Sequence, residues 1–108
     1  METYIKLYDW MIQSDELKGI TANVYALISQ MSCDNAGGFW GTYEHMARRL
    51  RTTKRSCISA VNQLVEIGAV EKRDINGRKT LLAIPSWADY QIKRYHDLIS
   101  GQKLARIL

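Results

Sequence analysis

The chain has 108 residues, of which 46% are apolar and 24% charged, and this length and composition predict one globular domain with a single modest core. No apolar run approaches the roughly 20 residues that a membrane-spanning helix needs, and the first residues carry neither a basic nor a long apolar segment, so we expect no membrane span, no signal peptide and a cytoplasmic location. The net charge is +4, but it is unevenly distributed: residues 1–44 hold two bases against six acids, whereas residues 45–108 hold thirteen bases against five acids. This asymmetry favours a polyanionic partner, with a solvated surface that binds no partner as the alternative.

The N-terminal third predicts one clear helix after less regular chain. Residues 4–8 alternate weakly and indicate either a short strand or an arm packed on the core, and residues 9–18 indicate a short helix or a turn. Thr21 has the properties of an N-cap. The residues after it repeat at i, i+3, i+4 and i+7, as Val24, Leu27, Ile28 and Met31. This stripe predicts a helix with one buried face, followed by a loop at residues 32–38.

A second helix is predicted after a short apolar segment. Phe39-Trp40 is expected to enter the core as a very short strand. Thr42 is the expected N-cap, and Glu44 in the first turn would interact favourably with the helix dipole. The inner stripe of this helix is Tyr43, Met46, Ala47 and Leu50.

A third helix should follow a tight turn at residues 51–53. Thr53 is its expected N-cap, and the helix should end near Ile67, before Gly68, which suits a left-handed C-terminal position. At about 100° per residue, the inner face gathers Cys57, Ala60, Val61 and Leu64. The opposite face gathers only hydrogen-bonding side chains along most of its length: Arg55, Ser59 and Asn62, with Ser56 and Gln63 on one flank.

A β-hairpin and a C-terminal helix complete the predicted elements. Asn76-Gly77 between two extended runs indicates a type I′ turn, which needs positive φ at both central positions and would place Asp74 opposite Lys79. After Pro85, Ser86 and Asp89 resemble a capping box. The aromatic-rich helix that they begin should reach about Ile99 and be broken at residues 100–101, with a short helix-compatible end that reads as if the chain continued. Its aromatic residues are expected either to pack back onto the domain or to pair with a second copy in a homodimer.

In this order the elements predict an α+β fold, a winged helix-turn-helix with a three-helix core and a β-hairpin wing, followed by a C-terminal helix. Residues 1–85 would form the DNA-binding domain and residues 86–108 a helical extension. In such folds the second helix of the helix-turn-helix enters a DNA major groove, where Arg pairs best with guanine and Asn with adenine. The sequence therefore predicts double-stranded DNA as the partner.

Basic residues gather around the turn and on the hairpin, where they would bind phosphates and fix the register of the protein on DNA. Each of these clusters alone is more often a solvated face, but their occurrence in helix, turn, helix and hairpin order favours DNA contact. The predicted DNA-contacting residues are Arg48, Arg49, Arg51, Thr53, Lys54, Arg55, Ser56, Ser59, Asn62, Lys72, Arg73, Arg78 and Lys79.

No sequence motif indicates an enzyme. The two histidines belong to no HExxH motif, and there is neither a phosphate-binding glycine loop nor a nucleophile motif. Cys33 and Cys57 lack the spacing of a metal site. We therefore predict no catalytic residue, no cofactor, no metal and no small-molecule ligand, and His45 is read as a surface or phosphate-contacting residue.

Five segments carry a resemblance to a known family. They are Leu17-Lys-Gly-Ile-Thr-Ala-Asn-Val-Tyr-Ala-Leu-Ile28, Gly38-Phe-Trp-Gly-Thr-Tyr43, Met46-Ala-Arg-Arg-Leu50, Thr53-Lys-Arg-Ser-Cys-Ile-Ser-Ala-Val-Asn-Gln-Leu64 and Ile67-Gly-Ala-Val70. They belong to a match that covers Leu17 to Ile84, about two-thirds of the chain. Together they resemble the N-terminal winged helix domains of plasmid replication initiators and phage replisome organisers of the DnaD-like and RepA-like kind.

This resemblance implies a role in replication initiation of a plasmid or phage and a groove-facing set formed by Thr53, Lys54, Arg55, Ser59 and Asn62. Transcriptional regulators of mobile elements share the same motifs, and some winged helices dock a protein instead of DNA, so both functions stay as alternatives. The family often has glycine where Arg51 stands, because a left-handed residue other than glycine costs about 1 kcal/mol. Either Arg51 is strained or the turn differs.

Overall fold

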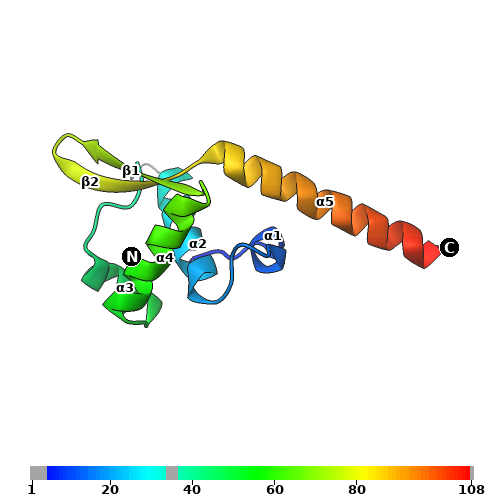
Figure 1. Ribbon diagram of the computed structural model, residues 1–108, viewed down its shortest axis with the longest axis horizontal. Coiled ribbons are helices and arrows are strands. Elements are labelled where there is room, and N and C mark those ends of the chain that lie inside the picture. The colour runs from blue at the N-terminus through cyan, green and yellow to red at the C-terminus, as the bar shows by residue number, and fades with distance from the viewer. Residues whose placement is uncertain (1–4, 34–36, 108) are drawn as a thin grey trace.

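The computed structural model describes residues 5–33 and 37–107, with side chains as far as Gly101, and Figure 1 shows their arrangement. In chain order the elements are α1 (Asp9–Gln13), α2 (Ile20–Cys33), α3 (Tyr43–Leu50), α4 (Lys54–Glu66), β1 (Val70–Ile75), β2 (Arg78–Ala83) and α5 (Pro85–Ile107). The two strands form an antiparallel sheet, which confirms the α+β class. The hairpin and α5 project in opposite directions from the packed helices, so the molecule is elongated, with extents of 56 × 30 × 26 Å.

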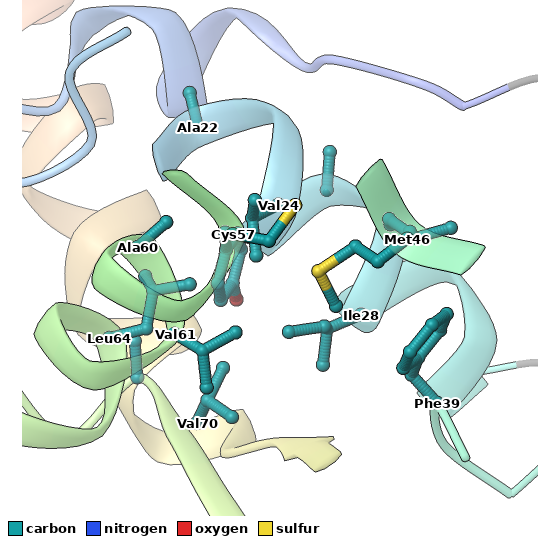
Figure 2. Close-up of a cluster of buried hydrophobic side chains, with 14 of the residues drawn as sticks. Ala22, Val24, Ile28, Phe39, Met46, Cys57, Ala60, Val61, Leu64 and Val70 are labelled. Carbon is teal, nitrogen blue, oxygen red and sulfur yellow. The ribbon is translucent and has the colours of Figure 1, made fainter. Parts of the chain in front are cut away.

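The core lies where α2, α3 and α4 meet the base of the hairpin. Figure 2 shows Val24 and Ile28 of α2, Met46 of α3, Leu64 of α4 and Val70 of β1 in one cluster, and all five side chains are buried. Helix α2 is the centre of this cluster, because other elements cover it on several sides. The apolar periodicity of its sequence therefore identified only part of its buried surface.

Tyr25 is the largest buried side chain that the periodicity of α2 did not select. Its ring packs against Trp10 of α1 and Trp87 of α5, with centroids 5.9 Å and 5.0 Å away. Burial raises the pKa of Tyr25 to about 12, because the low-dielectric surroundings disfavour the ionised hydroxyl. This aromatic cluster joins α1 and the start of α5 to the core.

The predicted start of α2 is wrong. The helix begins at Ile20, before the expected N-cap Thr21, which is buried and donates a hydrogen bond from its Oγ1 to Oε1 of Gln63, 3.3 Å away. The residues that precede α1 from Ile5 form an arm rather than a strand, and the Lys6 backbone N–H donates to Gln30 Oε1. The loop predicted at residues 32–38 starts later, since α2 extends to Cys33, and residues 34–36 lie outside the described part of the chain.

The Phe39-Trp40 segment divides between core and surface. Phe39 is buried, as predicted, and forms a one-residue bridge to Leu81, with both backbone N···O distances at 2.8–2.9 Å. Trp40 is 50% exposed, so the prediction that it enters the core is wrong. Successive residues of an extended chain point to opposite sides, and burial of Phe39 therefore turns Trp40 outwards.

The predicted helix caps around the α3–α4 turn are confirmed. The Thr42 hydroxyl accepts from the His45 backbone N–H, and the Thr53 hydroxyl accepts from that of Ser56 at 3.1 Å. Arg51 closes α3 in the left-handed conformation, with φ 53° and ψ 49°. The strain expected at this arginine is therefore present, while the turn keeps the usual three-residue length.

Replacing Arg51 with glycine is expected to raise the free energy of unfolding by about 1 kcal/mol, because glycine adopts positive φ without the contact between Cβ and carbonyl oxygen. Urea denaturation followed by circular dichroism measures the change. Arg48→Gly, within α3, is the control and should lower the free energy of unfolding by about 0.5–1 kcal/mol. Equal destabilisation of the two variants would contradict the strain at Arg51.

The hairpin has the predicted turn and register. Asn76 and Gly77 have φ of 54° and 80°, as a type I′ turn requires, and Asp74 pairs with Lys79. The predicted stop of α4 is also confirmed, since Gly68 follows the helix with φ of 81°. The hairpin thus leaves the core directly after α4.

The boundaries predicted for α5 are wrong at both ends. Pro85 is the first helical residue, so Ser86 lies inside the helix and is not its N-cap, and the Ile84 carbonyl accepts from the backbone N–H of Trp87. Residues 100–101 do not break the helix, which continues to Ile107, because glycine in a helix costs only about 1 kcal/mol and forbids nothing.

The first turns of α5 pack on the core, and later residues are more exposed. Trp87 Nε1 and Gln91 Nε2 both donate to Oε2 of Glu16, at 3.2 Å and 3.1 Å. Tyr90 and Leu98 are 60% and 53% exposed. Pairing of this helix with a second copy stays a prediction. Within the described residues, no helix combines the length and apolar character needed to cross a bilayer.

Candidate nucleic-acid interface

Helix α4 presents the polar face that the sequence predicted. The four residues of its inner face are buried, whereas Arg55, Ser59 and Asn62 are exposed. The helix is held in this orientation by Thr53 at its start and by packing of its inner face on α2 and α3. These three polar side chains therefore project from a helix whose opposite face is fixed in the core.

The turn between α3 and α4 gathers five cations within eight residues. Arg48, Arg49 and Arg51 are exposed at the end of α3, and Lys54 and Arg55 are exposed at the start of α4. The positive end of the α4 dipole lies at the same place. Both this dipole and the side-chain cations would therefore attract an anion there.

Two residues of the predicted DNA-contacting set have a structural role at this turn. The Thr53 hydroxyl caps the Ser56 backbone N–H and donates to Ser56 Oγ at 2.9 Å. These hydroxyls are engaged with each other, so they position the helix start in addition to any contact with a ligand. Thr53 is exposed, and Ser56 is half-buried.

A groove of about 660 Å³ separates the starts of α3 and α4 from the hairpin. Its charged border residues are Lys54, Lys72, Arg73, Lys79, Glu44 and Asp74. The sequence placed the bases of the turn and those of the hairpin in separate clusters. The fold brings Lys54 of α4 and Lys72 and Lys79 of the hairpin to the border of one groove.

Two of the predicted phosphate contacts already have carboxylate partners. Lys54 Nζ lies 2.8 Å from Glu44 Oε1, and Arg73 Nε lies 3.0 Å from Glu71 Oε1. The hydrogen bond from Lys54 lowers the pKa of Glu44, which keeps this carboxylate ionised and partly neutralises the lysine. All four side chains are well exposed, so solvent screens both pairs. The Glu71–Arg73 pair could have been predicted from the sequence, because residues i and i+2 of a strand share a face. The Glu44–Lys54 pair could not, because it depends on how α3 packs against α4.

The basic residues of the hairpin lie on two faces. Paired residues project from the same face of an antiparallel ladder, and successive residues from opposite faces. Lys72 pairs with Leu81, which also bridges to the inward-facing Phe39, so Lys72 and Lys79 share the groove side. Arg73 and Arg78 alternate to the outer side, although Arg73 also borders the groove.

Trp40 belongs to this outer side and was missed as a candidate site residue. The guanidinium carbon of Arg78 lies 4.5 Å from the centre of the Trp40 ring. The strand-like alternation after Phe39 was the signal that could have placed Trp40 on the surface. The apolar character of the tryptophan concealed it.

Three further titratable side chains, Cys57, Tyr43 and His45, belong to α3 and α4. Burial raises the pKa of Cys57 and of Tyr43, which favours their neutral forms. His45 is exposed, and its ring stacks on Phe39 with centroids 6.3 Å apart. Among the residues that the structure describes, no three His, Cys, Asp or Glu side chains gather as a metal site would require.

The arrangement at α4 and the groove can therefore bind a polyanion along one helix and read base edges with three side chains of that helix. In comparisons with known proteins, no family model matches the sequence, and no curated protein and no solved structure matches it significantly.

Proposed function

We propose that the chain is a winged helix domain that binds double-stranded DNA with α4 in the major groove and the hairpin as its wing. The observation that carries this proposal is the exposed face of Arg55, Ser59 and Asn62, directly beside the cations of the turn and of the groove. A recognition helix needs such a face, with phosphate-binding groups on its flanks.

The cations around α4 support binding of a duplex backbone. The α3–α4 turn would contact one strand with its arginines, and Lys72 and Lys79 would contact the backbone beside the wing. Glu44 and Asp74 at the groove border would disfavour phosphate at two positions and so help to fix the register. The resemblance of the sequence to replication initiators favours a role at a plasmid or phage origin over one in transcription.

Arg55→Ala tests the groove assignment. A preferred site is selected from a random duplex library, and binding is titrated by fluorescence anisotropy. Loss of a bidentate contact to guanine should weaken binding to this site by about 1–3 kcal/mol and weaken binding to random duplex less.

Arg94→Ala is the matched control, because it removes an exposed helical arginine from α5, away from α4. This variant should bind the selected duplex as the wild type does. Equal affinity of Arg55→Ala and wild type for the selected site, or equal losses in the two variants, would refute the assignment of α4 to the groove.

A further inference from the structure

The outer face of the hairpin carries an aromatic and basic surface, on the side opposite the proposed duplex contacts Lys72 and Lys79. Trp40 is 50% exposed although Arg78 lies against its ring, so much of the indole remains accessible. Ile75, which pairs with Arg78 across the hairpin, is 39% exposed. A large exposed aromatic side chain is costly in water, and such residues commonly mark a binding surface.

The backbone that carries Trp40 is fixed. Phe39 makes two backbone hydrogen bonds to Leu81, and the Gly38 N–H donates to the Met31 carbonyl at 3.0 Å. A Cβ on Gly38 would lie 2.7–2.8 Å from atoms of Thr80, Leu81 and Leu82, and Gly38 has φ of 116°. Only glycine allows this close approach, so the backbone on the N-terminal side of Trp40 is held against β2 by the bridge at Phe39 and by the packing of Gly38.

The charge of this face identifies its ligand. Arg78 and Arg73 are both exposed on it, and Arg73 is offset in part by its contact with Glu71. An aromatic ring with arginines beside it matches the surfaces that bind single-stranded nucleic acids, in which bases stack on the ring and cations bind the phosphates. A duplex cannot offer the face of an internal base to the indole, because its neighbours already stack on both sides.

We propose that Trp40 and Arg78 form a second nucleic-acid site that binds unpaired bases, with the indole stacked on one base and the arginines on the adjoining phosphates. The site goes beyond the proposed duplex binding and does not depend on it. If both sites act, the domain prefers a duplex joined to an unpaired segment.

The test uses fluorescein-labelled oligomers of twelve deoxythymidines, twelve uridines and a blunt duplex, titrated at low salt and followed by anisotropy. Trp40→Leu keeps an apolar side chain without the ring and should weaken binding to the thymidine oligomer about tenfold, within the range of about 5- to 150-fold for one stacked base. Trp40→Phe should stay within about threefold of wild type, because a smaller ring still stacks. All three proteins should bind the blunt duplex equally. If Trp40→Leu also weakens binding to the uridine oligomer, the site accepts both RNA and DNA.

Tryptophan fluorescence gives a second measurement. Trp10 and Trp87 are partly covered in the cluster around Tyr25. Among the described residues, Trp40 is therefore the most exposed tryptophan. Adding the thymidine oligomer should quench wild-type emission, and Trp40→Phe should abolish the quenching. This measurement still decides the matter if Trp40→Leu does not fold.

The proposal is overturned if Trp40→Leu binds the thymidine oligomer as tightly as the wild type does. It is also overturned if the wild type does not bind this oligomer, and the face would then suit a protein partner. Arg55→Ala distinguishes the two sites, because it should weaken binding to the selected duplex and leave the oligomer affinity unchanged. If the wild type binds the thymidine oligomer but no duplex, the proposed function is refuted and this site is not.

Discussion

Replacing Phe39 with alanine is expected to lower the free energy of unfolding by about 3–5 kcal/mol, which is the usual cost of removing a buried phenylalanine ring. The ring is only 3% exposed and belongs to the hydrophobic core. Its backbone is hydrogen-bonded to Leu81 of β2. Loss of the ring should therefore loosen the contact between this segment and the hairpin. Urea denaturation followed by circular dichroism measures the change.

Trp40→Ala is a demanding control for this prediction, because it removes a larger side chain from the neighbouring residue. Since Trp40 is half-exposed, the variant should lose no more than about 1 kcal/mol. Phe39→Leu, which fills most of the space, should lose less than Phe39→Ala. If Trp40→Ala costs as much as Phe39→Ala, the opposite placement of the two rings is wrong.

The elements that the sequence predicted well are those set by local interactions. Thr42 and Thr53 bond to backbone N–H groups three residues ahead, and Asn76-Gly77 needs only its own φ angles. The inner face of α4 followed from helical spacing alone. Such features depend on residues close in the chain, and one sequence is enough to recognise them.

The errors arise where distant residues decide the structure. Thr21 has the side chain of an N-cap, but the helix begins one residue earlier and the Thr21 hydroxyl donates to Gln63 of α4 instead. Ser86 would cap a helix if Pro85 did not already begin it. Residues 100–101 are poor helix formers, yet α5 continues through them.

The candidate site was predicted as a set of residues but not as a surface. Every predicted contact is exposed or, for Ser56, half-buried. Their grouping required the fold: the approach of Lys54 to Glu44, the groove between α4 and the hairpin, and the division of the hairpin cations between two faces. The first two relations are not encoded in spacing along one helix or strand, whereas the division of the hairpin cations follows from alternation along each strand.

Duplex affinity is expected to fall about a thousandfold between 50 and 200 mM monovalent salt, because about five or six neutralised phosphates give a log–log slope of about −5. Anisotropy titrations of the wild type on a random duplex measure this slope. Lys54 and Arg73 each contact a carboxylate, so we expect Lys72 and Lys79 to contribute more to this slope than those two residues do.

A double variant tests whether the groove lysines contribute to the salt dependence of duplex affinity. Lys72→Gln combined with Lys79→Gln should make the slope less steep by about two, since each lysine that binds a phosphate contributes about one. The control, Lys93→Gln combined with Arg94→Gln, removes the same charge from α5 and should leave the slope unchanged. If both double variants reduce affinity equally at every salt concentration, net charge alone attracts the duplex. The hairpin would then not lie on the backbone, and α4 would need another flank to orient it in the groove.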